Sequence, residues 1–198
     1  LRNSSAASDV YKRQVFRYSV DKLGQIVDRA LKLKIPMVAI FPQTNSSLKD
    51  SYGSEALNEN NLVCKAIRKI KDKYKNEIGI MTDVALDPYT SHGHDGILRN
   101  KRILNDETIE ILIQQSLLQA QMGSDVIAPS DMMDGRIGEI RQELDNNSLK
   151  DIKILSYAVK YASSFYGPFR DAVGSRKSLK GDKKTYQMDF SNSEEALR

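Results

Sequence analysis

Three segments of the chain combine residue types that could do chemistry. The first, residues 152–170, places Lys160 among apolar and aromatic neighbours. Apolar surroundings disfavour the charged form of an amine, so we expect the pKa of Lys160 to fall from about 10.4 toward neutrality. A neutral lysine amine can attack a ketone or aldehyde and form a Schiff base. A lysine whose charged end simply reaches solvent is the alternative interpretation.

The second segment, residues 82–96, follows a predicted strand and is rich in carboxylates and imidazoles. Oxygen-rich clusters suit magnesium, whereas mixed histidine and carboxylate sets can hold zinc. The same groups could move protons. A polar loop whose side chains bind its own backbone is the alternative. The residues concerned are Asp83, Asp87, His92, His94 and Asp95.

The third segment, residues 128–137, ends a predicted strand and begins a predicted helix with Ser130, Asp131 and Asp134. Side chains of this kind commonly cap a helix N-terminus, and we expect one of the three to do so. The others would then be free to line a site at the end of the strand.

The positive charge of the chain is concentrated in one short stretch. The net charge is +4, and residues 176–184 hold five basic residues against Asp182 alone, which is also +4, so the remainder is neutral. A nucleic-acid-binding protein usually spreads its charge over a face, so we expect no nucleic-acid partner. A single basic loop better suits a small anionic ligand, and a solvated loop that aids solubility is the alternative.

Length and composition indicate one soluble domain. The chain has 198 residues, of which 40% are hydrophobic and 28% charged, an ordinary globular balance. It lacks a stretch of about 18 apolar residues, so no membrane association is expected, and its one cysteine cannot form an internal disulfide. A cytoplasmic location is the default. Residues 1–15 show no pattern and are interpreted as a non-native or unstructured leader, followed by a domain over 16–198.

Apolar periodicity predicts strands that alternate with helices from Phe16 onward. Ser19 is the expected cap of the first helix, Asn105 or Asp106 that of the third, and Gly123 the residue that stops the third. The predicted helices cover about 20–31, 63–70, 105–122 and 134–146. The predicted strands cover 37–41, 78–84, 125–128 and 152–155, the first buried on both faces and the last running toward Lys160.

Alternating strands and helices with short connections imply a parallel sheet of the α/β class. A doubly wound open sheet and a (β/α)8 barrel both satisfy this pattern. No glycine-rich phosphate loop follows a strand, which weakens the nucleotide-binding version. Polar residues instead follow the strand ends, as on the active face of a barrel. We therefore favour a TIM barrel.

Several of these segments together resemble the delta-aminolevulinic acid dehydratase (porphobilinogen synthase) family. The resemblance covers about residues 16–198 and is carried by TDVALDPYTSHGHDG, APSDMMDGRIGEIR, SYAVKYASSFYGPFRDAVGS and GDKKTYQMD. It implies a (β/α)8 barrel, commonly octameric, that condenses two 5-aminolevulinate molecules into porphobilinogen for haem and tetrapyrrole biosynthesis. That activity is a lyase (hydro-lyase) reaction.

The resemblance also implies roles for individual residues. Lys160 matches one of the family's two Schiff-base lysines. Arg170 and Lys183 match residues that bind a substrate carboxylate, which would orient the ketone for attack. The remaining substrate-binding candidates are Asp83 (proton transfer or amine binding), Ser130 (hydrogen bonding) and Gln187 (a polar contact), with Lys184 the less favoured neighbour of Lys183.

The metal loop departs from the zinc-dependent members of the family, which carry three cysteines there. Those positions are Ala85, Asp87 and Asp95 in this chain. Oxygen ligands prefer magnesium to zinc. We therefore expect no thiolate zinc site and no organic cofactor. Two alternatives stay open for the metal, which are magnesium as an activator, with Asp87 and Asp95 as its candidate contacts, and no active-site metal at all.

The resemblance places only about strands two to five of the eight in this chain. The family's other catalytic lysine lies in a later strand, so we expect the chain by itself to be inactive in the complete reaction. Two alternatives stay open. One is a class I aldolase-like Schiff-base lyase on the same barrel, and the other is a non-catalytic α/β fragment that binds an anion.

Overall fold

A parallel sheet of four strands forms the centre of the computed structural model, which describes residues 9–12, 15–163, 165–166, 179 and 181–198. Its spatial order is β3-β4-β7-β8, and every neighbouring pair is parallel. The strand order follows the chain without a reversal, as in a barrel rather than in a doubly wound sheet. The strands are β3 (Met37–Ile40), β4 (Gly79–Val84), β7 (Val126–Pro129) and β8 (Lys153–Ile154).

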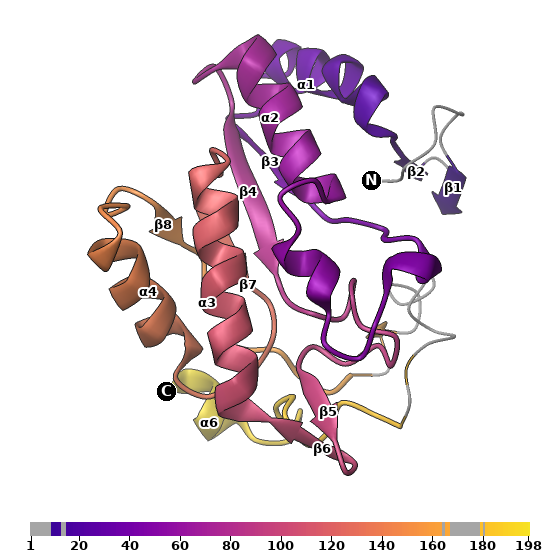
Figure 1. Cartoon of the computed structure of the whole chain (residues 1–198), viewed down its shortest axis with the longest axis vertical. Coiled ribbons are helices and arrows are strands. Elements are labelled where there is room, and N and C mark those ends of the chain that lie inside the picture. Colours follow the sequence, from indigo (N-terminus) through magenta and orange to yellow (C-terminus); the bar gives the residue numbers. More distant parts are fainter. Residues whose placement is uncertain (1–8, 13–14, 164, 167–178, 180) are drawn as a thin grey trace.

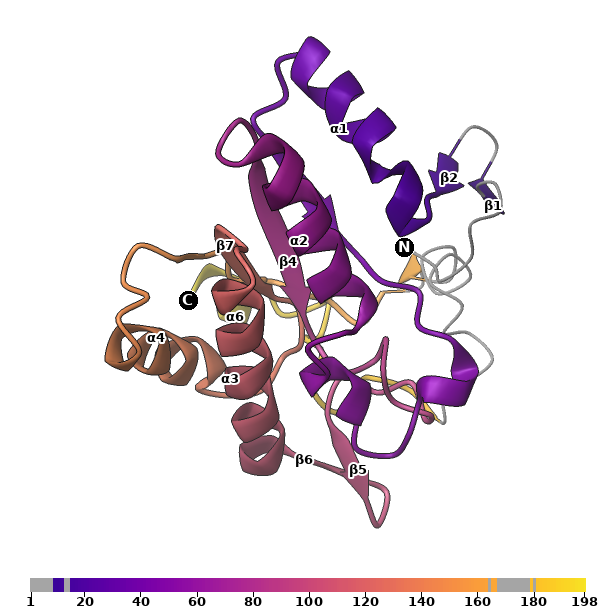
Figure 2. The ribbon, with the colours of Figure 1, turned by 45° about the horizontal axis from the view of Figure 1, so that its top comes forward.

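Four helices pack against one another in chain order, and the last three of them connect successive strands of the sheet. Figures 1 and 2 show α2 lying along β4 and α3 lying along β7. Each strand–helix–strand unit thus places its helix on the sheet, as the alternation in the sequence predicts. The four are α1 (Leu23–Lys32), α2 (Leu62–Tyr74), α3 (Asn105–Gln121) and α4 (Arg136–Asn146), and a short α6 (Ser193–Leu197) follows near the C-terminus.

Among the described residues, the smaller elements are two hairpins and three 3₁₀ turns. The hairpin β1-β2 lies beside the start of α1 (Figures 1 and 2), and β5-β6 precedes α3. Within the part of the chain that the structure describes, no helix is long and apolar enough to span a membrane. The elements are β1 (Asp9–Lys12), β2 (Val15–Arg17), β5 (Ile97–Arg99), β6 (Arg102–Leu104), and turns at Val20–Lys22, Ser46–Leu48 and Ser54–Leu57.

The β1 strand lies within residues 1–15, which carry no pattern in the sequence. Its pairing places Val10 opposite Phe16 and Asp9 opposite Arg17. Regular structure therefore begins before Phe16, where the predicted domain begins. The assignment of the leader as non-native stays a prediction, and residues 1–8 lie outside the described part.

Two apolar clusters hold the helices on the sheet. One joins α1 and α2 to β3 and β4, with Val27, Ile67 and Ile80 all at most 1% exposed. The other joins α3 and α4 to β4 and β7, with Leu112 and Ile140 fully buried. Burial of one such side chain contributes about 1.5–3 kcal/mol. These clusters fix the strand ends that carry the polar residues.

The prediction that the first strand is buried on both faces is wrong. Met37 and Phe41 are 37% and 38% exposed, whereas all four residues of β7 are buried. The difference follows from position, because β3 has β4 as its only neighbour in the described sheet and β7 lies between two strands. Apolar composition alone does not distinguish an edge strand from a central one.

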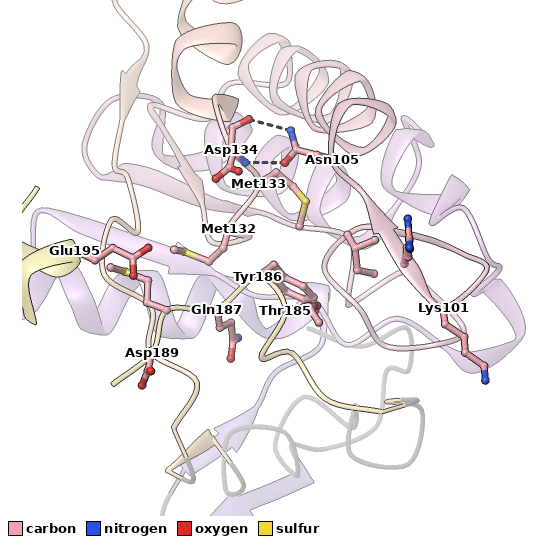
Figure 3. A pocket seen from close by; sticks show the side chains of 13 residues that line it. Lys101, Asn105, Met132, Met133, Asp134, Thr185, Tyr186, Gln187, Asp189 and Glu195 are labelled. Carbon is pink, nitrogen blue, oxygen red and sulfur yellow. Dashed lines mark hydrogen bonds between the residues drawn. The ribbon is translucent and has the colours of Figure 1, made fainter. Parts of the chain in front are cut away.

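The predicted caps are only partly correct. Ser19 precedes the first helical turn but makes no capping hydrogen bond, and α3 begins at Asn105 after Leu104. The Asn105 side chain instead binds the backbone of Asp134 on the neighbouring loop (Figure 3). Gly123, at φ 109°, follows the end of α3 as expected.

Neither Ser130, Asp131 nor Asp134 caps α4, contrary to expectation. The helix starts after Gly135, whose φ of 83° suits glycine. Asp131 accepts a hydrogen bond from the backbone N–H of Met133 at 2.8 Å and so stabilises the preceding turn.

The last strand is shorter than predicted. β8 ends at Ile154, but the following chain still runs beside β7, because Leu155 N–H donates to Ile127 O at 2.9 Å and Tyr157 N–H donates to Pro129 O at 3.4 Å. Lys160 consequently lies on an irregular segment that leaves the carboxyl end of the sheet.

Candidate active site

Lys160 points into the carboxyl end of the sheet. Its ammonium donates a hydrogen bond to the backbone carbonyl of Ser130 and lies 3.7 Å from Oδ2 of Asp95. Only 11% of its side chain is exposed. The amine that the sequence singles out is therefore inside the site and is not a surface lysine.

A second lysine lies in the same place. Lys183 Nζ is 2.7 Å from Asp95 Oδ1 and 3.4 Å from Asp87 Oδ2. Asp95 is fully buried and the Lys183 side chain is 9% exposed. Asp95 thus balances two ammonium groups, and buried charges of this kind are stable only when they are paired. We call Lys160, Lys183, Asp87 and Asp95 the carboxyl-end cluster.

The predicted fall in the pKa of Lys160 is wrong. Burial does lower the pKa, but the nearby carboxylates of Asp95, Asp87 and Asp83 outweigh burial and raise it. The prediction counted the apolar neighbours along the chain and missed the acidic residues that the fold brings close. Lys160 is consequently protonated at neutral pH and must lose a proton before it can act as a nucleophile.

The carboxyl groups of the site differ in acidity because their cations are unequally shared. Burial raises the pKa of Asp83 to about 7, although the Ser130 side chain and Lys160 oppose the rise. Burial also raises the pKa of Asp87 despite the adjacent Lys183. Asp95 is different, since Lys160 and Lys183 together overcome its burial and lower its pKa. A pKa of about 7 suits the Asp83 carboxyl to proton transfer near neutral pH.

Backbone contacts hold the two lysines together. Met188 N–H donates to Lys160 O at 3.0 Å, and Ala162 N–H donates to Met188 O at 2.8 Å. The segment that carries Lys183 therefore runs beside the segment that carries Lys160. Tyr186 Oη also lies 3.0 Å from His94 Nδ1. This contact links the segment that carries Lys183 to the loop after β4, which carries Asp87 and Asp95.

Two cavities of about 560 Å3 each adjoin this region. One is lined by residues that include Ser163, Lys183 and Lys184. The other lies between the Met132–Met133 turn and Tyr186, as Figure 3 shows. Gln187 lines both, and its Oε1 is buried without a hydrogen-bond partner among the described residues. The role of Gln187 as a polar contact to substrate stays a prediction.

The other predicted site residues divide into three groups. Asp83 and Ser130 lie beside Lys160, at the ends of β4 and β7. Lys184 is exposed and lies outside the carboxyl-end cluster, although it lines one of the two cavities. Arg170 lies outside the described residues.

The proposed metal contacts are engaged with lysine. Asp87 and Asp95 both bind Lys183, so their charge is already compensated, and Ala85 offers no ligand. Over the described ranges, no three His, Cys, Asp or Glu side chains are grouped to hold a metal ion. This arrangement does not fit an ion between the two carboxylates, and no chemical step is derived through one.

Sequence reasoning missed two buried glutamines under the site. Gln119 Nε2 donates to Asp83 O at 3.2 Å, and Gln115 Nε2 lies 3.4 Å from Ala85 O. Both residues are fully buried on the face of α3 that packs on β4. Their spacing of four, in register with Leu112, is the signal that could have placed them on the inner face.

The parallel sheet, with its charged side chains gathered at the carboxyl ends of the strands, defines the class of α/β barrel proteins that carry their functional residues on this face. The chain belongs to the delta-aminolevulinic acid dehydratase family, whose model matches residues 9–198. The match includes β1 and thus begins before the resemblance noted at Phe16.

Individual relatives agree. A delta-aminolevulinic acid dehydratase of Bradyrhizobium diazoefficiens is 59% identical over 184 residues, which are 93% of this chain and 52% of the relative. A chloroplastic one of Arabidopsis thaliana is 52% identical over 88% of this chain and 40% of its own length. The chain spans about half the length of the curated relatives it matches, or less.

A solved structure confirms the fold class. The crystal structure of delta-aminolevulinic acid dehydratase from Toxoplasma gondii, in complex with the reaction product porphobilinogen, matches with a TM-score of 0.90 at 43% identity. The match covers 93% of this chain and 53% of that one. The barrel expectation, with this chain contributing part of the barrel, is thereby confirmed.

Proposed function

We propose that this chain supplies the Schiff-base lysine, Lys160, of a porphobilinogen synthase, which condenses two 5-aminolevulinate molecules. The observation that carries the proposal is the placement of this amine, buried at the carboxyl end of the sheet beside Asp95 and Ser130. Family membership and the product-bound relative support the same substrate class.

The first step needs a neutral amine. A proton passes from the Lys160 ammonium to the Asp83 carboxylate, whose pKa of about 7 suits a proton acceptor. The nitrogen lone pair then attacks the ketone carbon of 5-aminolevulinate and forms a C–N bond. The ketone oxygen takes up one proton from the attacking nitrogen and one from Asp83 and leaves as water, giving the protonated imine. The neighbouring carboxylates stabilise the positive charge of the protonated imine.

Substrate binding involves the cationic residues of the site. Arg170 and Lys183 are the predicted partners of the substrate carboxylate, and Ser130 and Gln187 the predicted polar contacts. Because Lys183 is already bound to Asp87 and Asp95, an incoming carboxylate must compete with both. We therefore assign the larger share of carboxylate binding to Arg170.

What can be said of the metal ion, the oligomeric state and the cellular location comes from membership of the family. Family membership is consistent with an activating metal ion. Asp87 and Asp95 are bound to Lys183 and do not fit as its contacts, so magnesium stays a prediction. The octamer, the absence of a nucleic-acid partner and the cytoplasmic location stay predictions. Curated relatives include bacterial and chloroplastic proteins, so the comparisons do not fix a compartment.

Borohydride trapping tests the proposal. Incubating the chain with 5-aminolevulinate and sodium borohydride should reduce the imine to a stable amine, adding one substrate-derived mass to the protein. A Lys160→Met variant should gain no such mass. An adduct that forms equally well in the variant would contradict the assignment.

The same experiment separates the alternatives. A class I aldolase-like lyase would be trapped by sugar phosphates in preference to 5-aminolevulinate. A non-catalytic anion-binding fragment would form no covalent adduct with either. The carboxylate-rich surroundings of Lys160 favour the amino-keto acid, since its ammonium group finds acidic partners there.

A further inference from the structure

Helix α4 carries two arginines that bind backbone carbonyls at opposite ends of the β8 segment. Arg141 donates to Ile152 O at 2.6 Å and to Leu149 O at 3.1 Å, before β8 begins. Arg136 donates to Tyr157 O at 3.3 Å, after β8 has ended. Both side chains donate to backbone carbonyls, but only Arg136 contacts the part of the chain that leads from β8 to Lys160.

Arg136 joins the two pieces of chain that meet at the Lys160 amine. One piece ends in Lys160 and is held through Tyr157 O, three residues earlier. The other is the turn after β7, which Arg136 holds through Met133 O at 3.2 Å and through Asp131, 3.0 Å from Nε. Asp131 directly follows Ser130, whose carbonyl accepts the Lys160 hydrogen bond.

Burial separates this pair from an ordinary surface ion pair. The side chains of Arg136 and Asp131 are 10% and 0% exposed, whereas those of Arg141 and its partner Asp145 are 32% and 45% exposed. Burying an ion pair costs several kcal/mol of desolvation and is weak evidence for a stabilising role. The planar guanidinium offers donors in a fixed geometry, which suits it to hold two segments at one spacing.

We propose that Arg136, held by Asp131, is a positioning residue for Lys160. The pair fixes the segment that carries the amine relative to the Ser130 carbonyl and the carboxylates of the site. The inference rests on the proposed imine chemistry of Lys160. It assigns to Arg136 no contact with substrate, and it predicts an effect on how fast the imine forms and little effect on how tightly substrate binds.

Matched variants on the same helix test this. Arg136→Lys keeps the positive charge but loses the planar guanidinium and its several donors. Arg141→Lys makes the same change at the amino end of β8. The rate constant of borohydride trapping and the half-saturating concentration of 5-aminolevulinate are measured for each. We expect Arg136→Lys to lower the rate constant at saturation by about 10- to 100-fold with little change in half-saturation, as small misplacements of reacting groups do. Arg141→Lys should leave both within about twofold.

A second variant covers a failure to fold. Asp131→Asn can still accept the Met133 N–H but no longer pairs with the guanidinium, and it should lower the trapping rate in the same direction. Equal trapping rates in Arg136→Lys and Arg141→Lys, with wild type trapped normally, would overturn the positioning role while leaving the proposed function intact. Unfolding of both Arg136→Lys and Asp131→Asn would assign the pair to stability and overturn it as well. Absence of trapping in wild type would instead reject the proposed function.

Discussion

Both ends of the parallel sheet carry lysine–aspartate pairs, but their surroundings differ. At the amino end, Lys71 Nζ lies 2.9 Å from Asp125, with side chains 20% and 42% exposed. At the carboxyl end, Lys183 lies 2.7 Å from Asp95, with side chains 9% and 0% exposed. The first pair is one cation and one carboxylate near water. The second belongs to the carboxyl-end cluster, in which two cations and two carboxylates lie away from water.

The difference in burial determines how much each lysine–aspartate pair can contribute to the stability of the fold. An exposed pair contributes little, because water and salt screen it. A buried cluster carries a desolvation cost, and each member depends on the others to offset it. The carboxyl-end cluster therefore gains little stability from its charges, and its presence is better explained by the chemistry of Lys160.

The largest expected effect comes from Asp95→Asn. The change leaves Lys160 and Lys183 with no fully buried counter-ion, so we expect the free energy of unfolding to fall by about 3–5 kcal/mol. Asp125→Asn at the amino end keeps the hydrogen bond from Ile80 N–H and should cost at most about 1 kcal/mol. Urea unfolding of both variants measures this, and equal losses would remove the contrast between the two ends.

Lys183→Met should have the next largest effect. Asp87 and Asp95 lose their nearest cation, but Lys160 remains at 3.7 Å from Asp95, so we expect a loss of about 2 kcal/mol. The adjacent Lys184→Met changes an exposed side chain and should stay within about 0.5 kcal/mol. A neutral Lys183→Met variant in urea unfolding would show that the buried pair is dispensable.

A pH-dependent difference should identify Asp83. Its folded pKa of about 7 exceeds the unfolded value of 3.8, so between these values the folded chain holds more protons. Raising the pH through this window therefore lowers the free energy of unfolding, by up to about 1.4 kcal/mol per pH unit. Asp83→Asn removes this contribution. The stability of wild type relative to the variant should fall from about pH 4 to about pH 7 and then level off. A flat difference would reject the raised pKa.

Salt should have the smallest effect and should act at one end only. Raising the ionic strength to about 1 M shortens the screening length to about 3 Å. A double-mutant cycle on Lys71 and Asp125 should then lose most of its coupling, which is at most about 1 kcal/mol without salt. The coupling of Lys183 with Asp95 should change much less, because both groups are buried. Loss of both couplings would contradict the assigned burial.

Patterns along the chain predicted the architecture well. Apolar runs and helical periodicity located four strands and four helices, and the sequential strand order was implied by their alternation. Periodicity could not predict the exposure of Met37, since that exposure depends on which strands lie beside β3 in the described sheet. It also could not place the end of β8, because hydrogen bonds from Leu155 and Tyr157 continue without regular strand geometry.

Residue types selected side chains that the fold brings together at the carboxyl end of the sheet, but they did not predict the electrostatics there. Lys160, Asp83 and Ser130 were found from their positions after strands. The environment of Lys160 was misjudged because Asp95 and Asp87 are distant in sequence and meet it only in the fold. The buried Arg136–Asp131 pair was missed for the same reason, since capping explained an aspartate at that position equally well.

Peptide mapping of the borohydride-treated chain tests the central claim most directly. After reaction with 5-aminolevulinate, proteolysis and mass spectrometry would locate the modified lysine. We predict a single adduct on Lys160, with the equally buried Lys183 unmodified. An adduct on Lys183, or the absence of any adduct at a concentration of substrate that saturates binding, would contradict the account.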